Sequence, residues 1–216
     1  MKRYISILLF FGSVFLWSAC NKSNIHNTAD QVGISRVTHF ATFQMTGSKY
    51  MSIIQGTPYV EPGIKAFEGS TEIPVTTTGT VNSNQPGLYV LTYSATNKDG
   101  FVATTSRNVV VLAAHEVAGT DMSGKYNYIG SSTYTSTITK VAEGTYTTDN
   151  AWSGATVIPL LFTSLDGLVI SVPNQSSAYG PLFGSGTYNP GTKRLVYTLS
   201  LPTQGISNSN RNWQRQ

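Results

Sequence analysis

Few residues of this 216-residue chain have the type and spacing that catalysis requires. Glu143 and Asp149 could be the acid and base of a glycosidase, which works through two carboxylates that flank the glycosidic bond. Both stand among turn and strand residues, and we interpret them as turn and strand-edge residues of a hairpin. His26, His39 and His115 are not spaced as metal ligands, and no His-Glu-x-x-His motif occurs. We therefore expect no enzymatic activity, no cofactor and no metal centre.

Two short clusters carry oxygen atoms that calcium would accept. They are Asn97 with Asp99, and Asp149 with Asn150. Calcium takes about six to eight oxygen ligands, and neither cluster supplies that number. Asp99 is followed by glycine, a pair that is typical of tight hairpin turns. The sequence therefore favours turns at both places.

Aromatic residues in polar turns indicate binding instead. Sugar rings lie against flat aromatic faces, while nearby amides and hydroxyls bind their hydroxyl groups. Trp152 lies in a polar turn beside Asp149 and Asn150, and Tyr179 lies in another such turn. The alternative is that these aromatic side chains belong to the core, as most aromatics on strands do. We predict that Trp152, Tyr179, Asp149 and Asn150 bind a polysaccharide or oligosaccharide.

The single cysteine follows a segment with the features of a secretory signal. Residues 1–19 have a positively charged start, an apolar run to Trp17, and two small residues. This segment resembles a lipobox, in which small residues precede the cysteine that receives diacylglycerol. Ser18 and Ala19 fit that motif, while Trp17 occupies the position usually held by leucine. A buried free cysteine is the alternative, but Cys20 stands between an apolar leader and a polar tail. We expect Cys20 to be lipidated, with palmitate among its acyl chains.

The charge of the mature chain is small. The 14 basic and 10 acidic residues give a net charge of +4, and the leader carries two of the basic residues. No basic block remains outside the leader, so we expect no nucleic-acid partner. Charged residues make up 11% of the chain, less than half of the roughly 25% that is usual.

The first folded segment is predicted to be a β-sandwich. Residues 20–34 are polar and are interpreted as a flexible tether. Residues 35–112 contain short extended runs separated by Gly and Pro turns. The clearest strand follows Pro86-Gly87 and has alternate apolar residues on one face.

This segment resembles an immunoglobulin-like domain of bacterial secreted and surface proteins. Such domains are mainly spacers and adhesion modules without catalytic residues. The matching positions are Gly56, Tyr59, Glu61, Pro62, Gly63, Pro86, Gly87, Tyr89, Tyr93, Ala95, Arg107, Val109 and Val111.

The second folded segment is also predicted to be all-β. Residues 113–120 form a short linker, and residues 121–216 contain strands at intervals of 8–12 residues with turn signals between them. The fold class is therefore all-β: an N-terminal immunoglobulin-like β-sandwich, followed by a second all-β domain that is a sandwich or a partial barrel. Residues 202–216 are polar and are either a frayed tail or a last strand.

The whole chain resembles a family of two-domain lipoproteins of Bacteroides-type bacteria. Many members resemble accessory glycan-binding lipoproteins of polysaccharide import systems. The resemblance implies a lipid-anchored protein of the outer membrane, with the leaflet left open and envelope import proteins as possible partners. The alternative is a structural or assembly lipoprotein that binds other envelope proteins. The second half of the resemblance is carried by Asp121, Ser123, Gly124, Tyr126, Lys140, Val141, Gly144 and Tyr146.

The lipid anchor can be tested by metabolic labelling. We expect the protein to incorporate labelled palmitate, and Cys20→Ala to lose both the label and the association with membranes. Each buried methylene contributes about 0.8 kcal/mol, so several acyl chains hold a protein on a bilayer essentially permanently. Recovery of Cys20→Ala in the membrane fraction would contradict the anchor.

Overall fold

The computed structural model describes residues 28, 31–32, 35–154 and 156–216. The predicted signal segment and Cys20 lie outside the described residues, as does most of the predicted tether. Within the described part, regular structure consists of strands and one 3-10 turn at Pro202–Gln204, which confirms the all-β prediction.

The chain divides into a unit of residues 1–40 and a unit of residues 41–216. In the first unit, β1 (Gln31–Val32) pairs antiparallel with β2 (Ser35–Arg36). The second unit contains the two folded domains.

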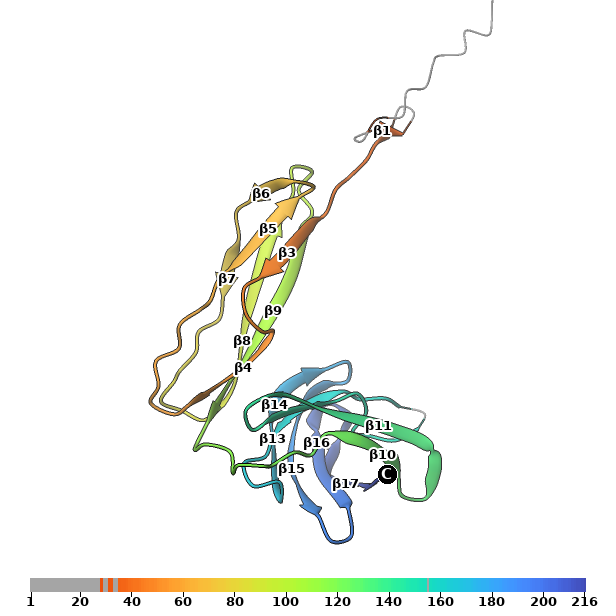
Figure 1. Cartoon of the computed structure of the whole chain (residues 1–216). Coiled ribbons are helices and arrows are strands. Elements are labelled where there is room, and N and C mark those ends of the chain that lie inside the picture. Colours follow the sequence, from red (N-terminus) through yellow and green to blue (C-terminus); the bar gives the residue numbers. More distant parts are fainter. Residues whose placement is uncertain (1–27, 29–30, 33–34, 155) are drawn as a thin grey trace, which may run out of the picture. The chain divides into compact units, whose positions relative to one another are not determined.

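The first domain is a sandwich of two β-sheets (Figure 1), as the immunoglobulin-like resemblance implied. One sheet has the strand order β3-β5-β6, and the other has the order β4-β9-β8-β7. All pairs are antiparallel except β4 with β9, which run parallel. The strands are β3 (Ala41–Met45), β4 (Tyr50–Ile54), β5 (Ile64–Glu68), β6 (Thr71–Ile73), β7 (Thr76–Thr78), β8 (Gly87–Thr96) and β9 (Val102–Leu112).

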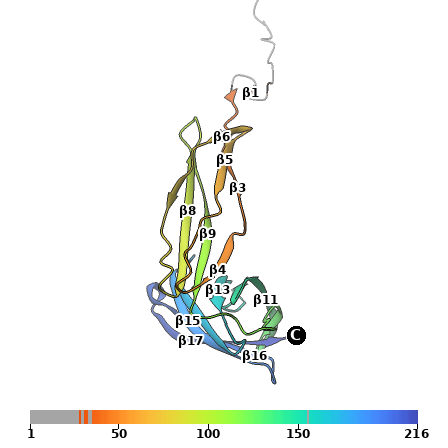
Figure 2. The same ribbon diagram turned by 60° about the vertical axis from the view of Figure 1, so that its left-hand side comes forward.

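Strand β8 shows why this sequence forms a sheet. It runs beside β9 along its length (Figure 2). Successive side chains of a strand point to opposite faces, so the apolar residues at alternate positions all face the core. Leu91, Tyr93 and Ala95 are accordingly at most 5% exposed, and Tyr89 is partly buried against the same core. The predicted strand face is therefore confirmed.

The turn after β8 is held by the side chain of Asn97. Its Oδ1 atom accepts hydrogen bonds from the backbone N–H groups of Asp99 at 3.2 Å and Phe101 at 2.8 Å. Gly100 has a φ of 87°, which glycine adopts without strain. The amide oxygen that calcium would need is thus used by the turn.

Arg107 of β9 is completely buried and forms an ion pair inside the first domain. Its Nη2 atom lies 3.1 Å from Glu61 Oε1, and its side chain is 0% exposed. The guanidinium also donates hydrogen bonds to three backbone oxygens, those of Thr46 (2.7 Å), Ser48 and Gly63 (3.3 Å). A buried charge is tolerated when it is paired and hydrogen-bonded, and these contacts join two separate segments, residues 46–48 and 61–63, to β9.

Glu61 completes this network from the other side. Its Oε2 atom accepts hydrogen bonds from Tyr59 Oη at 2.5 Å and Tyr93 Oη at 2.7 Å, and its Oε1 atom accepts one from Gly63 N at 3.1 Å. Burial alone would raise the pKa of the Glu61 carboxyl. The hydrogen bonds and the charge of Arg107 outweigh burial, and the pKa is lowered. The side chains of this network, those of Arg107, Glu61, Tyr59 and Tyr93, all belong to the immunoglobulin-like motif found in the sequence.

The second domain is a closed antiparallel barrel, whereas the sequence had left a sandwich or a partial barrel open. Each of its eight strands pairs with the next, and the last pairs back with the first. Residues 202–216 therefore contain a last strand rather than a frayed tail. The strands are β10 (Gly124–Tyr128), β11 (Ser131–Ala142), β12 (Thr145–Thr148), β13 (Leu160–Thr163), β14 (Val169–Ser177), β15 (Gly180–Asn189), β16 (Arg194–Leu201) and β17 (Ile206–Arg215).

Aromatic side chains fill the interior of the barrel. The rings of Tyr146 and Phe162 are stacked with centroids 5.3 Å apart, and Tyr197 meets Phe162 edge-on at 5.8 Å. Trp213 is fully buried and meets Tyr128 edge-on at 5.2 Å. Aromatic pairs in these arrangements stabilise a core by more than the burial of their apolar surface alone contributes. Because these side chains occupy the interior, we expect a ligand to bind at an end of the barrel or on its outside.

Two glycines let β15 approach β16 closely. A Cβ atom on Gly184 would lie 2.1 Å from the backbone oxygen of Thr198, and one on Gly186 would lie 2.6 Å from that of Val196. Glycine inside a strand commonly marks such a close backbone approach at a barrel bend. Any larger residue at these two positions would open the barrel wall.

The buried ion pair can be tested by removing one charge. We expect Glu61→Gln to lower the free energy of unfolding by about 3 kcal/mol, because breaking a buried pair leaves Arg107 uncompensated. Glu72→Gln is the matched control, since Glu72 pairs with Lys65 where both side chains are more than half exposed. An exposed pair contributes only about 0–1 kcal/mol. Calorimetric unfolding of both variants measures the difference, and equal effects would contradict this role of the pair.

The same pair sets an expected pH dependence. The folded-state pKa of Glu61 is below its ordinary value of 4.5, so its stabilising contribution is present above about pH 4.5. The contribution is lost as the pH falls through the folded-state pKa. We expect the stability difference between wild type and Glu61→Gln to be constant near neutral pH and to shrink below pH 4.5. A difference unchanged at pH 2 would be incompatible with this assignment.

Candidate functional site

The antiparallel order of the barrel places alternate connections at the same end. We call one end the linker end, because the linker before β10 lies against it, and the other the aromatic end. The linker end is formed by residues 113–123, 143–144, 164–168 and 190–193. The aromatic end is formed by residues 129–130, 149–159, 178–179 and 202–205.

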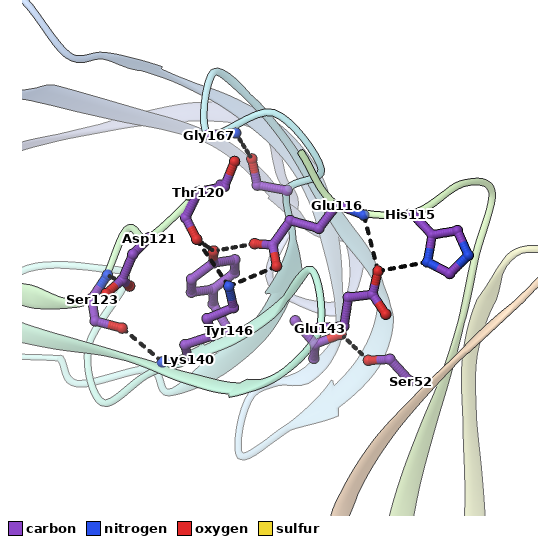
Figure 3. A network of polar contacts seen from close by, with 12 residues as sticks. Ser52, His115, Glu116, Thr120, Asp121, Ser123, Lys140, Glu143, Tyr146 and Gly167 are labelled. Atoms are coloured by element: carbon purple, nitrogen blue, oxygen red, sulfur yellow. Dashed lines mark hydrogen bonds and ion pairs between the residues drawn. The ribbon is translucent and has the colours of Figure 1, made fainter. Parts of the chain in front are cut away.

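A buried carboxylate fixes the linker to the barrel (Figure 3). Glu116 is only 7% exposed, and its Oε2 atom lies 2.6 Å from Lys140 Nζ. Its Oε1 atom accepts a hydrogen bond from Tyr146 Oη at 2.6 Å, and Lys140 Nζ also donates to the backbone oxygen of Thr120 at 2.9 Å. Burial, and then the hydrogen bond to Glu116, raises the pKa of the Tyr146 phenol, which therefore stays protonated. This network serves to hold the linker.

A second, exposed carboxylate holds the same linker. Glu143 Oε1 lies 2.9 Å from His115 Nδ1 and accepts a hydrogen bond from Glu116 N at 3.1 Å, as Figure 3 shows. The hydrogen bond from His115, followed by that from Glu116 N, lowers the pKa of the Glu143 carboxyl. Asp149 lies at the opposite end of β12, and its Oδ1 atom accepts a hydrogen bond from Thr137 N at 2.7 Å. The structure thus does not bring Glu143 and Asp149 together as a glycosidase pair.

The linker end also contains a cleft of about 660 Å³ with charged residues around it. Asp121 accepts a hydrogen bond from Ser123 N at 2.8 Å, which lowers the pKa of its carboxyl. Asp166 accepts hydrogen bonds from Leu168 N and from the next backbone N–H, both at 2.8 Å. Arg215 donates to the backbone oxygens of Asp121 at 3.5 Å and Ser123. These charged groups stabilise turns and the chain before β10, so the cleft offers few free groups to a ligand.

The aromatic end gathers exposed aromatic side chains. Tyr134, Tyr179 and Phe183 are 39%, 38% and 42% exposed, and they are the exposed aromatics of the barrel among its described residues. Tyr134 and Phe183 lie near the first residues of β11 and β15, and Tyr179 lies in the β14–β15 turn. Ile129 and Val157 add exposed aliphatic side chains to the same end. This end therefore presents apolar faces within a polar surround, as sugar-binding surfaces do.

The loop that carries Trp152 is held in place by hydrogen bonds. Asn150 is buried; its Oδ1 atom accepts from Trp152 N at 3.0 Å, and its Nδ2 atom donates to Ser153 O at 3.1 Å. Trp213 Nε1 donates to the backbone oxygen of Ala151 at 3.4 Å. The side chain of Asn150 thus shapes the turn that carries Trp152.

Arg211 of β17 covers one face of Trp152, and sequence reasoning missed it. The guanidinium carbon lies 3.6 Å from the centroid of the Trp152 ring, while the ring is partly buried against the barrel core. A ligand that approaches this face meets the guanidinium before the indole. Side chains two residues apart on a strand share a face, so Arg211 points inward together with Trp213. The sequence did not predict this, because the segment lacks the apolar alternation by which a strand is recognised.

The remaining predicted residues lie at the same end. Tyr179 is exposed, and its backbone oxygen accepts hydrogen bonds from Thr203 Oγ1 at 2.6 Å and Gln204 Nε2 at 3.2 Å. Tyr134 lies over the Trp152 loop, since a Cβ atom on Gly154 would be 1.9 Å from its ring. The structure thus places Trp152, Asp149 and Asn150 on one loop of the aromatic end, and Tyr179 on another connection of that end.

Comparison with known proteins supports the interpretation of the first domain. Residues 43–111 match the protein family described as "Bacterial surface protein, Ig-like domain". The chain is also similar to the crystal structure of a lipoprotein from Bacteroides thetaiotaomicron, at 25% sequence identity and a TM-score of 0.40, covering 82% of this chain and 100% of that one. A search of curated proteins finds no match. The family match covers the sandwich alone.

The described residues contain neither a candidate membrane-spanning helix nor a candidate metal-binding group. Within that part of the chain, no helix is both long and apolar enough to cross a membrane. Within the same part, no three His, Cys, Asp or Glu side chains are grouped so that they could hold a metal ion.

The two carboxylates of the linker end allow a matched test. We expect Glu116→Gln to speed hydrogen exchange of residues 113–120 by about tenfold, because it removes the buried charge that pairs with Lys140. Glu143→Gln is the control, and its effect should be smaller since Glu143 is 43% exposed. Exchange measured by mass spectrometry compares the variants. Equal protection in wild type and Glu116→Gln would mean that the ion pair does not hold the linker.

Proposed function

We propose that this protein is a lipid-anchored accessory protein of the bacterial cell envelope that binds glycans at the aromatic end of its barrel. The match of residues 43–111 to Ig-like domains of bacterial surface proteins supports a place in the cell envelope. In this proposal the first domain is a stalk, because such domains commonly act as spacers, and the barrel is the binding domain. Cys20 provides the lipid anchor, and the outer membrane is the proposed site.

The observation that carries this proposal is the segregation of exposed aromatics. Of the described side chains of the barrel, Tyr134, Tyr179 and Phe183 are exposed aromatics, and each lies at one end. Scattered exposed apolar residues need no explanation, but a group at one end with polar loops around it marks a binding surface. The packed interior leaves no room for a ligand inside the barrel, which supports binding at the rim in this proposal.

A structural or assembly role is the second candidate, and one feature of the first domain favours it. The described sheets of the sandwich end in strands β3, β6, β4 and β7, whose outer edges can add a strand from another protein. The closed barrel has no such edge. Cross-linking in intact cells that recovers one stoichiometric protein partner on the sandwich would favour this candidate over glycan binding.

Affinity electrophoresis against a panel of polysaccharides tests glycan binding. We expect one or more polysaccharides to retard the protein, and Tyr134→Ala and Tyr179→Ala each to weaken retardation by about tenfold, since each removes a ring on which a sugar can lie. Phe101→Ala is the control, an aromatic residue that is 50% exposed on the first domain. Lack of retardation across the panel, or equal loss in all three variants, would contradict the proposal.

A further inference from the structure

Arg211 occupies a position where a cation is unexpected. It lies two residues before Trp213 on β17, and side chains two apart on a strand share a face. Trp213 is 0% exposed in the barrel core, and the strand partner of Arg211 is Tyr197, which is 1% exposed. Arg211 therefore points to the inner side of the barrel wall, near the rim of the aromatic end.

Arg211 differs from the other cations on the inner side of the barrel. Lys140 pairs with Glu116, and Arg215 donates to two backbone oxygens of the chain before β10. Among the described residues, Arg211 has no carboxylate within ion-pair distance, and its guanidinium donates only to the backbone oxygen of Asn210 at 3.3 Å. Its Nε atom is buried and has no acceptor in that part of the chain. Apart from its contact with the Trp152 ring, the guanidinium thus has no charge partner in the described part of the chain.

The surroundings of Arg211 fit a negatively charged sugar. Stacking on Trp152 holds the guanidinium plane and removes water from one of its faces. A fixed guanidinium plane binds a carboxylate through two parallel hydrogen bonds, which are among the strongest that a protein makes. The carboxylate of Asp149, at the same end, is already bound to Thr137 N. Asp149 and Arg211 do not form an ion pair, so the guanidinium is not neutralised by this carboxylate.

Neighbouring groups suit the rest of a sugar ring. Tyr134 lies over the Trp152 loop and exposes 39% of its surface. Ser209 lies two residues before Arg211 and adds a hydroxyl on the same face of β17. The rim thus offers an aromatic face for the sugar ring, a hydroxyl for its OH groups and a guanidinium for its carboxylate.

We propose that Arg211, stacked on Trp152, is the anion-recognition residue of the site and selects glycans that contain uronic or other carboxylate-bearing sugars. This inference rests on the proposed function, because it names the class of glycan that the aromatic end binds. It assigns Trp152 the task of orienting Arg211.

Affinity electrophoresis of the full-length protein in detergent tests this inference with matched polymers. The probes are polygalacturonate, the same polymer after reduction of its carboxyl groups, dextran sulfate and unmodified dextran. We expect wild type to be retarded by polygalacturonate and at least tenfold less by the reduced polymer. Dextran sulfate serves to detect general attraction to polyanions.

Variants assign the effect to the guanidinium. Arg211→Gln should weaken binding to polygalacturonate at least tenfold, and Arg211→Lys should restore it only in part, because an ammonium cannot form the two parallel bonds. Arg194→Gln is the control, since Arg194 is exposed and its Nη2 atom bonds Asn212 Oδ1 at 3.0 Å. Thermal unfolding shows whether each variant is folded. If Arg211→Gln does not fold, Arg211→Lys alone decides, and unchanged binding by it overturns the inference.

The other outcomes separate the inference from the proposed function. Equal retardation by polygalacturonate and its reduced form would overturn the inference and leave glycan binding in place. Retardation by dextran sulfate that Arg211→Gln and Arg194→Gln weaken equally would also overturn it, since charge alone would then explain binding. Lack of retardation by any of these polymers and by the wider panel would overturn both.

Discussion

A single buried ion pair organises the first domain. Arg107 lies on a central strand with no exposure to solvent, and its charge must be matched within the domain. Glu61 supplies that match, and Tyr59 and Tyr93 fix the carboxylate. The partners come from segments far apart in the chain, so the pair can form only when the two sheets are packed together. Buried charges of this kind are weak sources of stability but can specify one arrangement of segments over others.

A similar ion pair holds the linker to the barrel. Glu116 is buried against Lys140 and Tyr146 in the same way that Glu61 is buried against Arg107 and two tyrosines. In both places a carboxylate of a segment outside the strands pairs with a cation and accepts a hydrogen bond from a tyrosine, and the cation and the tyrosine both lie on strands. Irregular chain is thereby fixed without a helix or a disulfide. The chain has one cysteine, so this polar fixation replaces the cross-links on which many secreted domains rely.

The sequence predicted those elements whose pattern is local. The alternation of Leu91, Tyr93 and Ala95 identified β8, because that pattern lies within one strand. Closure of the barrel was not predictable, because β17 has mainly amide and hydroxyl side chains and no apolar alternation. Its identity as a strand depends on pairing with β10, a contact between distant residues. The stacking of Arg211 on Trp152 depends on the same closure, and so the sequence did not predict this contact.

Closure through β10 and β17 has a consequence for how the barrel is made. The pairing of Tyr126 with Arg215 joins residues separated by nearly the whole domain, and such distant contacts cost chain entropy before they add stability. Until β17 docks, the barrel is an open sheet with two free edges that can pair with other copies. Proteolytic loss of β17 would therefore leave unpaired sheet edges and make the remaining barrel strands prone to aggregation.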